Sequence, residues 1–137
     1  MIRLLLFLAL VSAPSRAAEP VRLTIFHTND IHGWIMPRPS SVDYSTSPLI
    51  GGAAVLAKFV AAESGPKLLL DAGDWFQGTP EGTLSQGRVM AEVFNALSYD
   101  AVALGNHEYD LGEEVLKNLI KEIKVPVLAA NIYKRGE

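Results

Sequence analysis

The chain has 137 residues and no cysteine, and its 12 basic and 15 acidic side chains give a formal net charge of −3 at pH 7. This length suits one domain, and the lack of cysteine excludes disulfides and zinc sites built from thiolates. The acidic balance differs from the basic face that nucleic-acid-binding proteins present, so we expect no nucleic-acid polymer among the partners of this protein.

Residues 1–17 show the pattern of a secretory signal peptide. Arg3 precedes an apolar run over residues 4–11 that is too short to cross a bilayer as a helix. Small side chains then place a cleavage position after Ala17. The alternative is a buried N-terminal helix. We expect residues 18–137 to be exported to the periplasm or the extracellular space, without a stable membrane anchor.

The next part of the chain reads as a strand, a loop, a helix and a second strand. Residues 21–28 are β-branched and apolar, which predicts a buried strand. Residues 29–50 are rich in proline, serine and glycine and are expected to form a loop. An alanine-rich helix is predicted from Gly51 to about Ser64, and a short apolar strand follows over residues 67–71. The apolar side of that helix is formed by Val55, Leu56, Phe59 and Val60.

Apolar periodicity predicts two further helices. A glycine-rich loop over residues 72–82 leads to a helix over residues 87–98. Strands are expected over residues 100–104 and 125–130, on either side of a helix over residues 113–124. The first of these helices carries one apolar stripe, made of Val89, Met90, Val93, Phe94 and Leu97.

Strands that alternate with helices of this length are typical of βαβ units, so the sequence predicts an α/β fold with a mostly parallel sheet. Ligands of such sheets gather beyond the carboxyl ends of the strands. Polar residues follow the predicted strands at positions 29–32, 71–74, 105–107 and 131. We therefore expect these side chains to converge in space.

Three of these residues are candidate metal ligands. Asp30 and His32 lie two residues apart, so in extended backbone their side chains point to the same side, and this pair commonly binds Mn, Fe or Zn. The alternative is an aspartate that caps a turn and a histidine at the surface. Asp74 follows Gly73, where the backbone can turn sharply, and its two oxygens can bridge two cations. The alternative for Asp74 is an Asx-turn.

The run Gly-Asn-His-Glu at residues 105–108 adds a ligand and a candidate catalyst. The side-chain oxygen of Asn106 is a neutral ligand, and His107 can protonate a leaving alkoxide or stabilise charge on phosphoryl oxygens. Asp110 can hold the imidazole of His107 in one tautomer, or it can cap the following helix. Glu108 is interpreted as a solvated residue or as a support for its neighbours.

These ligands together predict two divalent ions. Asp30, His32 and Asp74 hold the first ion, while Asp74 and Asn106 hold the second. Paired ions about 3.5–4 Å apart can clamp a phosphate and activate a water molecule. Oxygen and imidazole ligands suit Mn, Zn, Co, Fe or Mg, so the identity of the metal stays open. Two ligands are too few for the second ion, and we expect further ligands from elsewhere.

The motifs resemble those of the calcineurin-like metallophosphoesterases, and the surrounding residues resemble the branch of 5′-nucleotidases and UDP-sugar hydrolases. The matching stretches occur in order along the chain. They are residues 25–33 (IFHTNDIHG), 69–74 (LLDAGD), 77–79 (QGT), 95–97 (NAL), 99–110 (YDAVALGNHEYD) and 129–133 (AANIY).

The resemblance implies a four-layer αββα sandwich and dinuclear-metal hydrolysis of the phosphate esters of nucleotides or nucleotide sugars by a metal-activated water. It makes Asp30 and His32 ligands of the first ion, Asp74 the bridge and Asn106 a ligand of the second ion. His107 matches the catalytic histidine of the family, and Asp110 matches its carboxylate partner. Family members are usually exported, in agreement with the signal peptide.

The family places further histidines and a base-binding domain beyond these motifs. The only histidines here are His27, His32 and His107. We expect His27 to be a core or supporting residue of the first strand. Residues 18–137 are therefore interpreted as an incomplete N-terminal metallophosphoesterase domain without the C-terminal nucleotide-binding domain. We expect this part alone to bind metal weakly and to hydrolyse little.

Other functions are compatible with the same motifs. A cyclic-nucleotide phosphodiesterase or a thiosulfohydrolase would use a similar site, and a truncated secreted module would bind without catalysis. The sequence leaves the exact substrate and the oligomeric state open.

Overall fold

The structure of the protein is a computed structural model that describes residues 19–40, 48–133 and 136. The expected signal peptide, residues 1–17, lies outside the described residues. Within the described ranges, no helix has both the length and the apolar character needed to cross a membrane.

Four parallel strands form the main sheet, in the order β1-β4-β5-β6. The register joins Thr28 of β1 to Asp71 of β4, and Asp71 to Val102 of β5. The carboxyl ends of the strands therefore lie at one edge of the sheet. This arrangement confirms the α/β fold that the alternation of strands and helices predicts. The strands are Thr24–Thr28 (β1), Lys67–Asp71 (β4), Ala101–Ala103 (β5) and Val127–Leu128 (β6).

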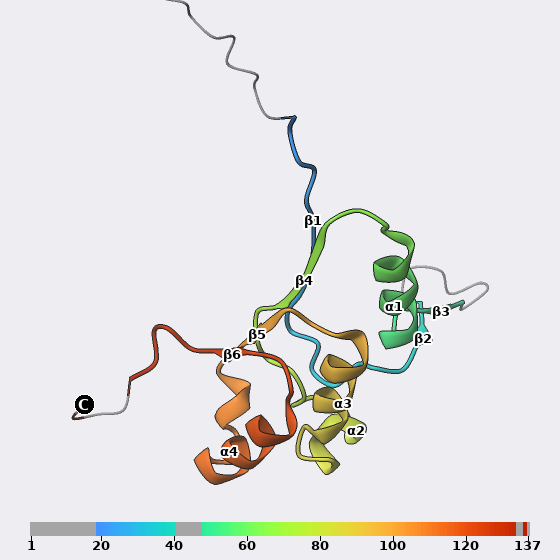
Figure 1. The fold of residues 1–137 in the computed structure, drawn as a ribbon. Helices are drawn as coiled ribbons and strands as arrows, with labels where there is room; N and C mark the ends of the chain where they lie inside the picture. The colour runs from blue at the N-terminus through green and yellow to red at the C-terminus, as the bar shows by residue number, and fades with distance from the viewer. Residues whose placement is uncertain (1–18, 41–47, 134–135, 137) are drawn as a thin grey trace, which may run out of the picture.

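Three helices connect these strands and lie on one side of the sheet (Figure 1). Right-handed crossovers between neighbouring parallel strands require this arrangement. Side chains that point from the strands to the helical side, such as Leu69 and Val102, are buried. The helices are Ala53–Ala62 (α1), Arg88–Leu97 (α3) and Glu113–Glu122 (α4).

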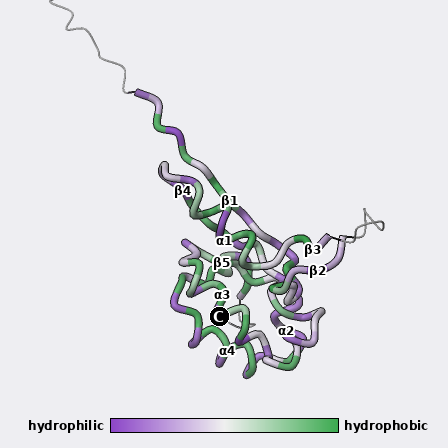
Figure 2. The backbone as a smooth tube through the Cα atoms, turned by 90° about the vertical axis from the view of Figure 1, so that its right-hand side faces the viewer, coloured by the Kyte–Doolittle hydropathy of each residue, from purple (hydrophilic) through white to green (hydrophobic). Residues whose placement is uncertain are grey.

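The core lies between the sheet and α3. Met90 and Phe94, from the predicted apolar stripe, are fully buried. Phe94 packs edge to face on Trp75 and Tyr99, with ring centroids 5.3 and 4.9 Å apart. Figure 2 shows hydrophobic and hydrophilic stretches mixed along the backbone in the region of the helices, as expected for helices that bury one side. Because Trp75 directly follows Asp74, the core anchors the loop after β4.

The helix α1 packs through a narrower stripe than the sequence predicts. Leu56 and Val60 contact the core, whereas Val55 is 40% exposed and Phe59 is 65% exposed. The predicted apolar side of α1 is therefore only partly packed among the described residues. Leu56 and Val60 are four residues apart and so form one line along the helix, and this line faces the core.

The face of the sheet opposite the helices is exposed among the described residues. Leu23, Ile25 and Leu128 on this face are 49, 56 and 54% exposed. His27 follows Ile25 by two positions, so it points to the same face and is exposed. Among the described residues, His27 therefore does not have the predicted core or supporting role.

Two small features fall within, or overlap, segments predicted as loops. The short strands Arg38–Pro39 (β2) and Leu49–Ile50 (β3) pair antiparallel before α1. The helix Pro80–Leu84 (α2) begins after Thr79, whose hydroxyl accepts a hydrogen bond from the backbone N–H of Gly82. Threonine followed by proline is a helix-start signal, so α2 was recognisable from the sequence. A pair of two-residue strands leaves no such periodic signal.

Candidate metal centre

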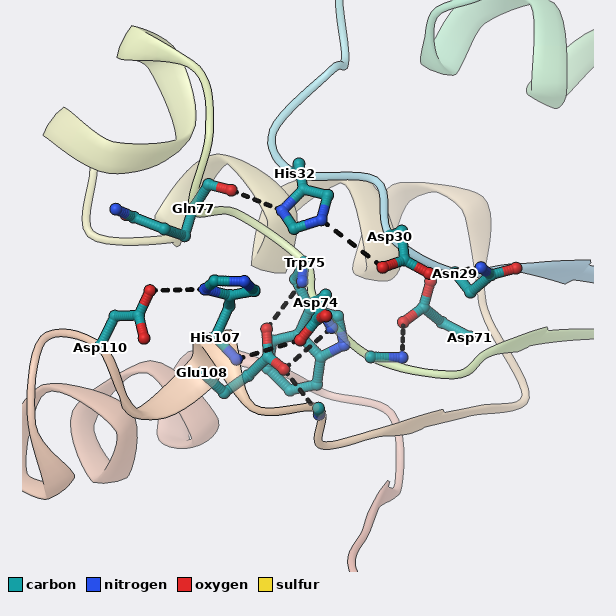
Figure 3. A network of polar contacts seen from close by, with 12 residues as sticks. Asn29, Asp30, His32, Asp71, Asp74, Trp75, Gln77, His107, Glu108 and Asp110 are labelled. Carbon is teal, nitrogen blue, oxygen red and sulfur yellow. Dashed lines mark hydrogen bonds and ion pairs between the residues drawn. The ribbon is translucent and has the colours of Figure 1, made fainter.

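Three loops meet at the carboxyl edge of the sheet, one each after β1, β4 and β5 (Figure 3). The first two are joined by backbone hydrogen bonds that continue the pairing of β1 and β4. The N–H groups of Asp30, His32 and Gly33 donate to the carbonyls of Gly73, Asp74 and Trp75, at 3.0, 3.0 and 2.8 Å. This ladder fixes the first two candidate loops relative to each other.

Three predicted ligands have left-handed backbone conformations. The φ angles are +51° at Asp30, +50° at His32 and +60° at Asp74. Such conformations cost about 1–2 kcal/mol per residue for most side chains, although aspartate tolerates them better than most. Strained backbone of this kind concentrates at functional sites, where the surrounding structure holds it in place.

The structure brings three potential donors together. Ligand atoms of His32, Asp74 and His107 all lie within 4.8 Å of one another. Asp30 adjoins this group, since its Oδ1 is 3.5 Å from Nε2 of His32. The two imidazole rings meet edge to face, with centroids 5.2 Å apart. The convergence expected from the sequence is therefore present in the fold, with His107 within the group and Asp30 beside it.

Hydrogen bonding selects the tautomer of His32. Its Nδ1 lies 2.6 Å from the backbone carbonyl oxygen of Gln77. A carbonyl oxygen only accepts, so Nδ1 carries a proton, and Nε2, on the side of Asp30, is the nitrogen available to a cation. Histidines that bind metals are usually oriented in this way, by donation from the other ring nitrogen to a carbonyl or carboxylate.

Asp74 bridges two loops instead of forming an Asx-turn. Its Oδ1 accepts a hydrogen bond of 3.0 Å from the backbone N–H of His107. The local turn belongs to Asp71, whose Oδ1 accepts from the N–H of Gly73 at 2.8 Å. The sequence alternative of an Asx-turn therefore describes Asp71 and not Asp74.

The buried side chain of Asp71 stabilises the start of the loop after β4. Its side chain is 5% exposed, and its Oδ2 accepts a hydrogen bond of 2.6 Å from the hydroxyl of Thr28. That hydroxyl also lies 3.1 Å from the hydroxyl of Tyr99. Burial raises the pKa of Asp71 above its ordinary value, while the hydrogen bonds from Thr28 and Gly73 oppose the rise.

His107 is paired with Asp110. The Nδ1 atom of His107 and Oδ2 of Asp110 are 2.6 Å apart, and both side chains are about one-third exposed. This hydrogen bond is the main cause of a raised pKa at His107, and the charges of Asp110, Asp74 and Glu108 act in the same direction. The alternative role of Asp110 as a helix cap is not seen, because α4 begins after Gly112 without a side-chain cap.

Asn106 directly precedes His107 on the same loop and has an exposed side chain. It stands at the start of the short 3₁₀ helix His107–Tyr109 (η1). The structure thus places all six predicted site residues on the three converging loops. The contacts join Asp30, His32, Asp74, His107 and Asp110 into one continuous group.

Glu108 differs most from its sequence interpretation. The side chain is 1% exposed, so the expectation of a solvated residue is wrong, while the alternative of a supporting residue fits. Its carboxylate accepts hydrogen bonds from the backbone N–H groups of Asp74, Trp75 and Gly105. Position alone did not reveal this, because a residue next to an exposed asparagine on a loop gives no signal of burial.

The third and second loops touch backbone to backbone. A Cβ atom added at Gly73 would lie 2.5 Å from the nitrogen of Gly105, and one added at Gly105 would lie 2.2 Å from Oδ1 of Asp74. Only hydrogen atoms fit at these two positions. The close approach brings the carboxylate of Asp74 to the loop of His107.

The donor set fits a divalent cation. Carboxylate oxygens and imidazole nitrogens converge from loops that are fixed by hydrogen bonds and by the core. Ions such as Mn, Fe, Co and Zn accept this mixture of oxygen and nitrogen ligands. The arrangement can therefore bind a divalent ion beside an ionisable histidine.

Comparison with known proteins places this site in a family. Residues 23–135 match the family model described as calcineurin-like phosphoesterase. The chain is 46% identical to the 5′-nucleotidase of Bos taurus, over 88% of this chain and 22% of that protein. The crystal structure of the 5′-nucleotidase precursor from Thermus thermophilus has a TM-score of 0.70 and 38% identity, over 80% of this chain and 22% of that chain. The NAD nucleotidase of Haemophilus influenzae has a TM-score of 0.72 and 34% identity, over 83% and 24% of the respective chains.

The chain spans less than a quarter of the length of these relatives. The match to the family model nevertheless covers the sheet, the three helices and all three loops of the site. Members of this family use divalent metal ions, in agreement with the donor set. The chain belongs to the calcineurin-like phosphoesterase family.

Proposed function

We propose that this chain provides part of the active site of an exported, metal-dependent phosphohydrolase that acts on nucleotides or nucleotide sugars. The observation that carries the proposal is the grouping of His32, Asp74 and His107 at the carboxyl edge of the sheet. The names of the relatives support a nucleotide substrate over a cyclic-nucleotide phosphodiesterase or a thiosulfohydrolase.

Two divalent ions fit the proposed ligand set. Asp30, His32 and Asp74 would hold one ion, and Asp74 with Asn106 would hold the other. When bound, the ions supply an activated water and offset negative charge on the phosphoryl oxygens. The residues of this chain then provide the positions of the ligands, through the ladder between the first two loops and the contact between Gly73 and Gly105.

His107 has the properties of a proton donor to the substrate. Asp110 accepts from its Nδ1, which leaves Nε2 to face an oxygen of the phosphate ester. The raised pKa of His107 keeps the ring protonated to higher pH than an isolated imidazole. A cationic imidazole can stabilise charge on a phosphoryl oxygen and protonate the leaving alkoxide.

Residues 18–137 would form an incomplete part of a larger αββα domain. Two protein ligands, Asp74 and Asn106, are too few for the second ion, so further ligands would come from other parts of the larger domain. The apolar face of the sheet that carries Leu23, Ile25 and Leu128 is suited to contact a second layer of structure. A separate region would then bind the base of the nucleotide.

The test is an assay of the full gene product with AMP, UDP-glucose and a cyclic nucleotide, in the presence of Mn²⁺ and after treatment with a chelator. We expect metal-dependent hydrolysis of AMP or UDP-glucose that Asp74→Asn abolishes. Asparagine accepts left-handed backbone, so this variant changes the ligand and not the fold. Hydrolysis that survives both the chelator and Asp74→Asn contradicts the proposal.

A further inference from the structure

Glu108 is a buried carboxylate that faces backbone N–H groups. Its Oε2 accepts from the N–H groups of Asp74 and Gly105 at 3.0 and 2.7 Å, and its Oε1 accepts from the N–H of Trp75 at 2.7 Å. These donors come from two loops, one after β4 and one after β5, and Gly105 is 31 residues from Asp74 and 30 from Trp75 in sequence. One side chain thus connects both loops of the candidate site (Figure 3).

The ion pairs found among the described residues do not involve Glu108. A buried carboxylate is costly unless hydrogen bonds or an opposite charge compensate for its lost hydration. Here three N–H donors provide that compensation, and hydrogen bonds to a charged acceptor are about twice as strong as neutral ones. The hydrogen bonds that replace the lost hydration of Glu108 are therefore the same bonds that connect the two loops.

Asp74 both donates and accepts hydrogen bonds across the two loops. The N–H of Asp74 donates to Glu108, while the carboxylate of Asp74 accepts from the N–H of His107. Asp74 has a φ of +60°, so its conformation depends on contacts that hold it in place. The carboxylate of Glu108 accepts from the backbone nitrogens of Asp74 and of the next residue, Trp75, which flank the left-handed residue Asp74.

From this geometry we infer that Glu108 is a positioning residue of the metal centre. It holds Asp74 in its left-handed conformation and sets the distance from the Asp74 carboxylate to His107. Glu108 itself does not touch the ion or the substrate. This inference rests on the proposed function, since it assigns Glu108 a role in metal binding by Asp74.

The variant Glu108→Gln tests the role with little change in shape. An amide has one oxygen, so either the N–H of Trp75 or the pair from Asp74 and Gly105 must face an NH₂ group instead of an acceptor. The variant Glu108→Asp keeps both oxygens but is one methylene shorter. The control is Glu92→Gln, the same change at an exposed position of α3.

Two measurements on the full gene product separate a positioning role of Glu108 from a general effect on stability. The first is the amide NMR spectrum without metal, where we expect the N–H signals of Asp74, Trp75 and Gly105 to move in Glu108→Gln and not in Glu92→Gln. The second is Mn²⁺ affinity at a temperature where each variant is folded. We expect Glu108→Gln to bind Mn²⁺ about tenfold to a hundredfold more weakly than the parent, as for other residues that orient a ligand, and Glu108→Asp to be intermediate.

The amide signals and the Mn²⁺ affinity decide whether Glu108 positions Asp74. Unchanged signals of all three amides, or an unchanged Mn²⁺ affinity in folded Glu108→Gln, overturns the inference. If Glu108→Gln does not fold, the same two readings on Glu108→Asp decide in the same way. A parent chain that binds no Mn²⁺ contradicts the proposed function, and the amide signals then decide alone whether Glu108 positions Asp74.

Discussion

The contact between Gly105 and Asp74 predicts a large effect from the smallest possible side chain. In Gly105→Ala, the new Cβ would stand 2.2 Å from Oδ1, 2.7 Å from the nitrogen and 2.9 Å from Cγ of Asp74. The oxygen must therefore retreat from 2.2 Å to at least the 3.4 Å at which ordinary contact begins. The Cβ would also press on the Asp74 nitrogen, which donates to Glu108, so the loop has to shift as a unit.

Overpacking of this kind typically costs about 1–3 kcal/mol of the free energy of unfolding. For a chain of this size, each kcal/mol lowers the melting temperature by roughly 4 °C. We expect Gly105→Ala to melt about 4–12 °C below the parent and to bind Mn²⁺ about tenfold more weakly, because Asp74 is displaced. Thermal denaturation by circular dichroism and Mn²⁺ titration at low temperature measure the two effects.

The matched control for this prediction is Gly65→Ala. An added Cβ at Gly65 meets only the flexible side-chain tip of Glu63 at 3.1 Å, and Gly65 lies outside the left-handed region. We expect this variant to resemble the parent in both measurements. A Gly105→Ala protein with the melting temperature and the Mn²⁺ affinity of Gly65→Ala would refute the reasoning about the packed loops.

Three further predictions concern the strained backbone, the histidine pair and the buried carboxylate. Because φ is +51° at Asp30, Asp30→Gly should be more stable than Asp30→Ala by about 1–2 kcal/mol in thermal denaturation, and equal stability would argue against strain there. Asp110→Asn should lower the pKa of His107, measured by NMR in the metal-free protein, because the hydrogen bond to Asp110 raises that pKa above 6.5. A raised pKa of His107 stabilises the fold at pH below 6.5, and this stabilisation is lost as the pH rises through the pKa of the folded state. The parent should therefore be more stable than Asp110→Asn by a larger margin at pH 6 than at pH 9. The same margin at both pH values would contradict the pairing of His107 with Asp110. Thr28→Val removes a donor from the buried Asp71 carboxylate and should cost about 1–3 kcal/mol in urea denaturation at pH 7, whereas a cost near zero would exclude a supporting role.

The elements with a strong periodic signal could be predicted from the sequence. The bounds predicted for β4 agree with the structure at both ends, and α3 buries Met90 and Phe94 from its predicted stripe. The last two strands of the sheet, β5 and β6, are shorter than predicted, because pairing stops after two residue pairs on each side of β5. Apolar composition marks where a strand can form, while its length depends on partners that the pattern does not specify.

The candidate site was predictable where it depends on topology. Parallel strands bring their carboxyl ends to one edge, and this alone predicts that Asp30, Asp74 and His107 converge. The support of the site could not be predicted, because it depends on which way a side chain turns within a loop. Glu108 turns inward from η1, and Gly105 touches Asp74 through space, and neither leaves a periodic signal in the sequence.

The central claim is that the loops after β1 and β4 bind a divalent ion through His32 and its neighbours. Mn²⁺ titration of the full chain, followed by electron paramagnetic resonance, tests it most directly when His32→Ala is compared with His27→Ala. His27 is an exposed histidine on the same segment that points to the open face of the sheet, so it matches the change in composition. We predict that the parent and His27→Ala bind Mn²⁺ alike and that His32→Ala loses this binding. Equal binding by all three proteins, or no binding by the parent, would contradict the account.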